Sequence, residues 1–259
     1  MTVPLDAHVV LRGVAKRFGD GPPVLAQVDF AVQLGSFVSL IGPSGCGKST
    51  LLRMIAALSP ATSGEILIDG RSPERGQPGV AFIFQEPTLL PWLPVQANIE
   101  VPLRIRRVAR AERERRAAEM LRLVRLEHVR GHYPRELSGG MKMRVSVARA
   151  LVQSPRLLLM DEPFGALDEM TRHHLNEELL EIREAERWTA FFVTHSVAEA
   201  VFLSDRILVM AARPGCIVAD VPVPFAYPRG PELREQRDYH DLVDRVAQLL
   251  RAGEKGEGR

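Results

Sequence analysis

The sequence has few cysteines, almost no excess of charge and no long apolar run, and each shortage argues against a class of protein. Its 259 residues include two cysteines, Cys46 and Cys216, which are too few for a disulfide framework and indicate a reducing compartment. Basic residues number 34 and acidic residues 32, which argues against nucleic acid as the main partner. No apolar run approaches the ~18 residues that cross a bilayer, and the first residues lack a signal-peptide pattern. We therefore expect a soluble, cytoplasmic protein with a large core.

Two kinds of apolar pattern predict two kinds of β-strand. Residues 28–34 alternate apolar and polar side chains, as a half-buried strand does, and residues 66–70 form a second strand that runs into a turn. Together they predict an antiparallel β layer near the N-terminus. Four further runs are almost continuously apolar, which is typical of parallel strands buried on both faces, although a short core helix gives the same pattern. These runs are residues 36–41, 80–84, 157–160 and 190–194.

A polar or glycine-rich group follows each of the four continuous runs. The groups begin at Gly42, Gln85, Asp161 and His195. Ligands of open parallel sheets bind beyond the carboxyl ends of the strands. The sequence therefore predicts one site at this edge of the sheet, built from four segments that are distant along the chain.

The first of these segments has the pattern of a phosphate-binding loop. Residues 42–49, GPSGCGKS, fit G-x-x-x-x-G-K-[ST] between a predicted strand and a helix with an apolar face at Leu51, Leu52, Met54, Ile55 and Leu58. A chance glycine-rich turn would not combine this spacing with both neighbours. The loop's N–H groups and helix N-terminus suit phosphates, while Lys48 can reach the β- and γ-phosphates of ATP and Ser49 can ligate Mg²⁺. The predicted nucleotide-binding residues of this loop are Gly42, Pro43, Ser44, Gly45, Cys46, Gly47, Lys48, Ser49 and Thr50.

The polar groups after the other three strands complete a hydrolytic site. Asp161 is suited to hold Mg²⁺, and Glu162, which points away from its neighbour at a strand end, is the candidate general base. A surface turn is the alternative for an isolated Asp-Glu pair, but four apolar residues precede this one. His195 is predicted to contact the γ-phosphate, although a lone histidine is usually structural, and Gln85 to contact Mg²⁺ or water. We thus assign Glu162, His195, Lys48 and Gln85 to catalysis and Ser49, Gln85 and Asp161 to the metal.

A second glycine-rich turn, LSGG at residues 137–140, also precedes a helical pattern. Ser138 can cap that helix, and Gly139 and Gly140 allow close approach by an anion. The helix carries apolar residues at positions expected to be buried, namely Val145, Val147, Ala148 and Leu151. Taken alone, the turn is equally well explained as a plain helix cap.

The region between Gln85 and residue 154 predicts an inserted helical subdomain, at about residues 88–153. Residues 104–125 contain nine arginines interleaved with glutamates, above a stripe formed by Leu121 and Val124. The charged face is either simply solvated or placed against lipid headgroups or a membrane partner. After Pro231, apolar residues at helical spacing predict a final amphipathic helix, and the tail at residues 253–259 is expected to be disordered.

The order of these motifs resembles the ATP-binding subunits of ABC transporters along nearly the whole chain. The matching segments are GPSGCGKST, Gln85, LSGG, LLLMDEP, FGALD and VTHS. The resemblance implies an α/β fold with a P-loop NTPase core and a mainly parallel sheet, an N-terminal antiparallel β layer and an inserted α-helical subdomain. It places the ATP-binding domain at residues 7–225 and a C-terminal helical extension with its tail at residues 226–259.

In that family the nucleotide site is composite. The phosphate loop of one subunit and the LSGG helix of the other enclose one ATP, which implies an ATP-dependent, head-to-tail homodimer. Ser138, Gly139 and Gly140 would then bind the partner's nucleotide. Asp168 would lie at the dimer seam, and Phe18 matches the position of the aromatic ring that stacks on adenine. Met143 stands where glutamine is usual, which would remove a polar group near the composite site.

Residues 85–103 and 211–218 are similar to an importer group that serves nitrate, sulfonates, taurine and pyrimidine precursors of thiamine. This similarity implies ATP-driven import through transmembrane permease subunits, with a separate solute-binding protein, at the cytoplasmic face of the inner membrane. Trp92 would dock the permease or pack in the core. One alternative is an ABC ATPase that acts on DNA, ribosomes or cluster assembly, but the chain lacks the tandem unit or long coiled coil typical of many such proteins. A module that binds ATP without turnover is disfavoured by Glu162 and His195.

Overall fold

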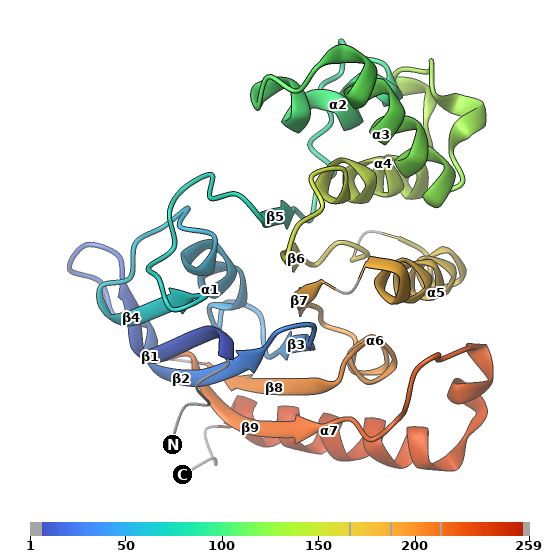
Figure 1. The fold of residues 1–259 in the computed structure, drawn as a ribbon. Helices are drawn as coiled ribbons and strands as arrows, with labels where there is room; N and C mark the ends of the chain where they lie inside the picture. The colour runs from blue at the N-terminus through green and yellow to red at the C-terminus, as the bar shows by residue number, and fades with distance from the viewer. Residues whose placement is uncertain (1–6, 166, 187, 213, 256–259) are drawn as a thin grey trace.

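A computed structural model describes residues 7–255 of the chain, apart from residues 166, 187 and 213. In this part the strands form two sheets, which are flanked by helices (Figure 1). The smaller sheet is antiparallel, with the order β2-β1-β4. Its strands are β1 (Ala7–Arg17), β2 (Pro23–Gln33) and β4 (Ser63–Ile68). This sheet is the antiparallel layer that residues 28–34 and 66–70 predict.

The larger sheet has the order β5-β6-β7-β3-β8-β9, and all its neighbouring strands are parallel except β8 and β9. Its strands are β3 (Phe37–Ile41), β5 (Val80–Ile83), β6 (Leu157–Asp161), β7 (Thr189–Val193), β8 (Arg206–Ala211) and β9 (Cys216–Pro222). All four continuous apolar runs are therefore confirmed as strands. The inner strands β3, β6 and β7 are buried at every position, whereas the edge strand β5 alternates.

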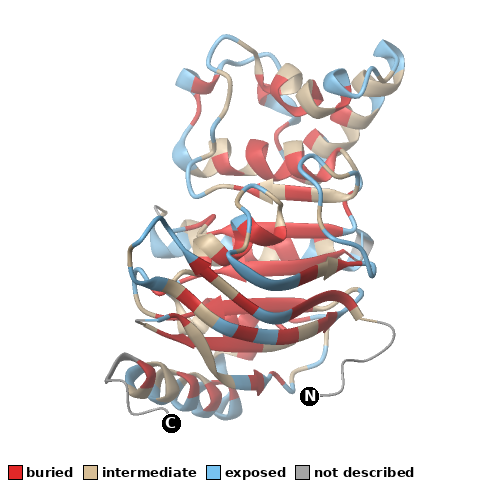
Figure 2. Ribbon diagram, turned by 90° about the vertical axis from the view of Figure 1, so that its left-hand side faces the viewer, coloured by how far each residue is buried: buried red, intermediate tan, exposed pale blue. Residues whose placement is uncertain are grey.

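Each face of the larger sheet has its own apolar core. On one face, Val38 and Leu40 of β3 belong to a cluster with the smaller sheet and α1 (Lys48–Ile55). On the other face, Phe37 and Ile41 belong to a cluster with α5 (Glu169–Glu186), α6 (Val197–Leu203) and α7 (Arg237–Lys255). Buried residues accordingly concentrate in the sheet layer (Figure 2). Because β3 is covered on both sides, its run carries no polar–apolar alternation.

Between β5 and β6 the chain forms the predicted helical region, drawn in green and yellow in Figure 1. Its elements are α2 (Val95–Ile105), α3 (Arg110–Leu123), the short 3₁₀ turns η1 (Glu127–Val129) and η2 (Pro134–Glu136), and α4 (Gly139–Leu151). Leu121 and Val124 are buried as expected. On the outer face Arg115, 57% exposed, pairs with Glu112 and Glu119 at 2.8 and 2.5 Å. The charged side chains on this face of α3 thus pair with one another, three or four residues apart along the helix.

The C-terminal segment packs back onto the larger sheet. It forms the 3₁₀ turn η3 (Pro231–Glu235) and then α7, which contacts β8 and α6. Leu242 and Val246 are buried on its inner face. Disorder was expected from residue 253 onward, but α7 continues to residue 255, because Gly253 lies close to Met210 and Val218 of the sheet. The remaining tail, residues 256–259, lies outside the described residues.

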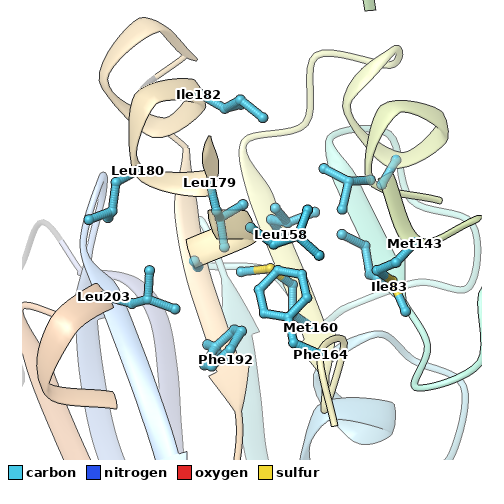
Figure 3. Packing of buried hydrophobic residues seen from close by; sticks show 14 of the residues in the cluster. Ile83, Met143, Leu158, Met160, Phe164, Leu179, Leu180, Ile182, Phe192 and Leu203 are labelled. Atoms are coloured by element: carbon cyan, nitrogen blue, oxygen red, sulfur yellow. The ribbon is translucent and has the colours of Figure 1, made fainter. Parts of the chain in front are cut away.

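Two further expectations about single side chains are wrong. Leu58 was assigned to the apolar face of the helix after the phosphate loop, but α1 ends at Ile55 and Leu58 is 42% exposed. The left-handed backbone of Ala57, with φ of 54°, turns the chain away from the helix. Met143 is only 3% exposed and lies with Ile83 in the core beneath α4 (Figure 3), so it does not face outward toward a partner.

Among the residues that the structure describes, no helix is both long enough and apolar enough to cross a membrane.

Candidate active site

The phosphate loop joins β3 to α1, and its shape requires glycine. Gly47 stands directly before α1 with φ of 99°, in the left-handed region, and a Cβ there would lie 2.6 Å from Leu25 Cδ2. A Cβ on Gly42 would lie 2.8 Å from the carbonyl oxygen of Met210. Neighbouring strands β2 and β8 therefore hold the loop against the sheet. No residue with a side chain fits either position without moving the backbone.

Lys48 places a nearly buried cation inside this loop. Its side chain donates from Nζ to the carbonyl oxygens of Gly42 at 2.8 Å and Pro43 at 3.0 Å, and the residue is 4% exposed. Among the described residues, no carboxylate lies within ion-pair distance of this ammonium. A buried charge without a counter-ion is costly, so the loop is suited to an anion, and the N-terminus of α1 adds its dipole. The triphosphate of a nucleotide is such an anion.

The two carboxylates at the end of β6 diverge, as the sequence predicts. Asp161, 6% exposed, accepts a 2.7 Å hydrogen bond from the Ser49 hydroxyl. Burial raises the pKa of Asp161, although this hydrogen bond opposes the rise. A hydroxyl and a carboxylate oxygen so close together suit Mg²⁺, which prefers oxygen ligands.

Glu162 turns in the other direction because its backbone is left-handed, with φ of 48°. Its carboxylate lies 2.7 Å from Nε2 of His195 and accepts a 3.3 Å hydrogen bond from the Gln85 side-chain amide. The residues after β5, β6 and β7 thus meet at one point, although 110 positions separate Gln85 from His195. A carboxylate held between an imidazole and an amide can polarise a water molecule.

One open pocket is lined by eight of the predicted residues together with Val24. Its lining consists of Val24, Ser44, Gly45, Gly47, Lys48, Ser49, Thr50, Glu162 and His195. An adjoining cavity on the far side of Glu162 contains Gln85. Sequence reasoning missed Val24, which is an apolar residue of β2 and carries no motif. It also missed Thr194 and Glu199, which line the adjoining cavity beside His195.

Two predicted elements do not reach this pocket within the chain. Phe18 is 56% exposed, and its ring lies under the Lys16 ammonium at 4.7 Å from ring centroid to Nζ. Ser138 caps α4 by accepting a 3.3 Å hydrogen bond from the Met141 N–H, and it lines neither cavity. The LSGG turn is therefore a helix cap within this subunit, and Gly139, which is exposed, lines neither cavity.

The chain is similar to known proteins over most of its length. The ABC transporter family model matches residues 25–165. An aliphatic sulfonates import ATP-binding protein of Bacillus cereus is 42% identical over 98% of this chain and 97% of its own. A taurine import ATP-binding protein of Rhizobium johnstonii is 47% identical over 82% of this chain and 80% of its own.

Solved structures resemble the fold as well. A dimeric, post-hydrolysis state of an ATP-binding cassette bound to ADP and Pi has a TM-score of 0.73 and 32% identity, over 84% of this chain and 100% of that one. The residues that the family model matches include the phosphate loop, the Asp161–Glu162 pair and the LSGG turn. The fold, the anion-binding loop and these matches agree: the chain belongs to the ABC transporter family, as a subunit that binds and hydrolyses ATP.

Proposed function

We propose that this chain powers the import of a small sulfonated solute through separate transmembrane subunits. The observation that carries this proposal is the end-to-end similarity to an aliphatic sulfonates import ATP-binding protein, at 42% identity. The taurine relative supports the same chemistry, since taurine is itself a sulfonate. Nitrate and pyrimidine precursors of thiamine gain no comparable support. The subunit would act peripherally at the cytoplasmic face of the membrane, with a solute-binding protein delivering the solute to its permease.

In this proposal the phosphate loop and Lys48 hold the β- and γ-phosphates of ATP. Ser49, Asp161 and Gln85 are the proposed Mg²⁺ ligands; the side-chain amide nitrogen of Gln85 bonds Glu162, which leaves its oxygen for the metal. The bound ion would neutralise charge on the phosphate oxygens. Glu162 accepts the proton of the attacking water, and His195, beside it at 2.7 Å, contacts the γ-phosphate.

We further propose that the working unit is a head-to-tail homodimer. The exposed Ser138 and Gly139, together with the half-buried Gly140, would bind the partner's nucleotide. Asp168 would lie at the seam, where it is exposed and accepts a 3.0 Å hydrogen bond from the Thr171 N–H. The exposed ring of Phe18 would stack on adenine. Because the LSGG residues do not line the pocket of their own phosphate loop, a symmetric dimer would hold two composite sites.

The proposed permease contact uses Trp92, in the loop before α2. Its side chain is 69% exposed, which removes core packing as an explanation for this residue. A large exposed aromatic side chain is typical of a binding surface.

The test of hydrolysis and dimer formation uses the full chain with Glu162→Gln. We expect ATP binding to persist and turnover to fall about 10²–10⁴-fold, the usual contribution of a general base. Light scattering should show a monomer that becomes a dimer when ATP is added. Glu181→Gln is the matched control, because Glu181 is a surface carboxylate, 66% exposed, on α5. Unchanged turnover in Glu162→Gln would remove Glu162 from its role, and a monomer with ATP would contradict dimerisation of the isolated subunit.

The test of the solute measures uptake in cells that carry the chain with Lys48→Ala in place of the wild type. Uptake of labelled taurine or alkanesulfonates should be lost, while uptake of nitrate should be unaffected. The opposite pattern would overturn the sulfonate proposal and leave the ATPase assignment intact.

A further inference from the structure

The position of His195 is not fixed by packing of its own side chain. The imidazole is 47% exposed, and among the described residues its ion-pair partner is Glu162, at 2.7 Å. A half-exposed ring with one close partner can adopt other rotamers unless its backbone is held in place. The groups that hold the backbone on either side of His195 therefore decide where the ring lies.

Both neighbours of His195 are tied by side-chain hydrogen bonds. Thr194, 5% exposed, accepts a 3.0 Å hydrogen bond at its hydroxyl from the Ser196 N–H, which closes a tight turn around His195. Ser196 in turn caps α6 by accepting a 3.3 Å hydrogen bond from the Glu199 N–H. The turn that presents His195 is thus built on the Thr194 hydroxyl.

That hydroxyl is oriented by a buried carboxylate. Thr194 donates its proton to Oε2 of Glu199, a residue that is 6% exposed. The other oxygen, Oε1, accepts a 3.4 Å hydrogen bond from Asn176 and lies 4.0 Å from Nε of Arg172, both on α5. Glu199 therefore links the turn at residues 194–196 to the helix behind it. It lines the same cavity as Glu162 and His195.

A buried carboxylate is costly, and here its nearest cation is at the limit of ion-pair distance. Burial raises the pKa of Glu199, which expresses the same cost. Apolar side chains of similar size would fill this space without that cost. A buried carboxylate at this position is explained by the Thr194 hydroxyl, which Glu199 orients.

We propose that Glu199 is a positioning residue for hydrolysis: through the Thr194 hydroxyl it fixes the turn that holds the His195 imidazole against Glu162. This inference rests on the proposed roles of His195 and Glu162. It predicts that Glu199 matters for turnover only while His195 is present.

The test is a double-mutant cycle of Glu199→Ala and His195→Ala in the full chain, with steady-state ATP hydrolysis as the readout. Glu199→Ala should lower kcat about 10–100-fold, the effect of misplacing a group by a fraction of an ångström to 1 Å, with little change in KM for ATP. The double variant should be no slower than His195→Ala alone. Glu199→Gln should keep most of the activity, because its amide oxygen can still accept the Thr194 proton.

Controls separate this role from general stability. Glu100, 8% exposed and 3.5 Å from Arg113, is a similarly buried carboxylate in the helical subdomain. Glu100→Ala should lower the thermal midpoint without changing kcat. If Glu199→Ala does not fold, Thr194→Val and Thr194→Ser test the same contact: the valine variant should lose turnover, and the serine variant should keep it.

The outcomes distinguish the role of Glu199 from that of His195. Multiplicative losses in the double variant would overturn the positioning role of Glu199 and leave that of His195 standing. Wild-type turnover in His195→Ala would overturn both. Equal turnover in Thr194→Val and Thr194→Ser would also overturn the inference, since it assigns the link to the hydroxyl.

Discussion

The two glycine-rich segments of this chain, residues 42–47 and 138–140, both occur where a helix begins, but their glycines differ in what requires them. In the first turn the requirement lies inside the subunit. Gly47 has a left-handed backbone, and Cβ atoms on Gly47 and Gly42 would collide with Leu25 and with the backbone of Met210. The fold of one chain is enough to explain why these residues are glycine.

In the second turn, Gly139 has no such internal requirement. A Cβ on Gly139 would meet the Leu167 side chain at an ordinary 3.6 Å, and one on Gly140 would press on the Thr171 methyl group at 3.0 Å. Both glycines lie at the start of α4, in helical backbone, where alanine is more favourable than glycine. Packing within the subunit therefore does not explain the glycine at position 139, which supports the proposed contact with a partner's nucleotide.

The largest effect is expected from Gly47→Ala, which places a Cβ where the fold of the subunit requires glycine. Left-handed strain costs about 1–3 kcal/mol and overpacking against Leu25 costs about 1–3 kcal/mol more, so unfolding free energy should fall by about 2–6 kcal/mol. ATP binding should be lost with it. Urea denaturation and binding of a fluorescent ATP analogue measure the two losses. Gly131→Ala is the control, since an added Cβ there meets nothing within 4 Å. A Gly47→Ala variant that is stable and binds ATP would show that the loop does not require glycine at this position.

Gly139→Ala should produce the opposite pattern. Stability and ATP binding by the subunit should stay close to wild type, because the chain has room for the methyl group. Turnover should fall about 10–150-fold, the equivalent of one hydrogen bond to a charged group. ATP hydrolysis at protein concentrations that favour the dimer, alongside urea denaturation, measures both. Turnover that equals that of the wild type would place the second turn outside the active site.

The sequence predicts those parts of the site that depend on topology. Gln85, Asp161 and His195 could be grouped because each stands at the end of a nearly continuous apolar run, and parallel strands end at one edge of their sheet. What could not be predicted depends on packing in three dimensions. Val24 lines the pocket only because β2 crosses the phosphate loop, and Glu199 reaches Thr194 only because α6 turns it inward. Neither residue carries a motif.

The same limit explains the error at Met143. Its proximity in sequence to the LSGG turn suggested a place near the composite site, but α4 rotates by about 100° per residue, so a residue five positions after Ser138 lies on another face. That face of α4 packs on the sheet, and Met143 is buried with Ile83. Distance along the sequence does not identify the face of a helix that meets a partner.

Met143→Gln tests whether the side chain at position 143 belongs only to the buried face of α4. Although glutamine is usual here in the family, this core surrounds Met143 with apolar side chains. An amide without a partner costs about 1–3 kcal/mol, so unfolding free energy should fall by that amount while turnover per folded subunit stays unchanged. Urea denaturation beside ATP hydrolysis tests this, with Met143→Leu as the volume-conserving control. Faster turnover in Met143→Gln would mean that the side chain reaches the site after all.

Ser138 is expected to affect stability less than Gly47 does, and it decides whether the second turn is more than a cap. Its hydroxyl accepts from the Met141 N–H at 3.3 Å, so Ser138→Ala should cost about 1 kcal/mol of unfolding free energy, whereas Ser138→Gly should cost only a few tenths because glycine also suits the position. Both variants lack the hydroxyl. If that hydroxyl also binds the partner's ATP, turnover should fall equally in both, whatever their stabilities. Turnover that follows stability instead, with Ser138→Gly close to wild type, would reduce Ser138 to a helix cap and leave contact with the nucleotide to the backbone of the two glycines.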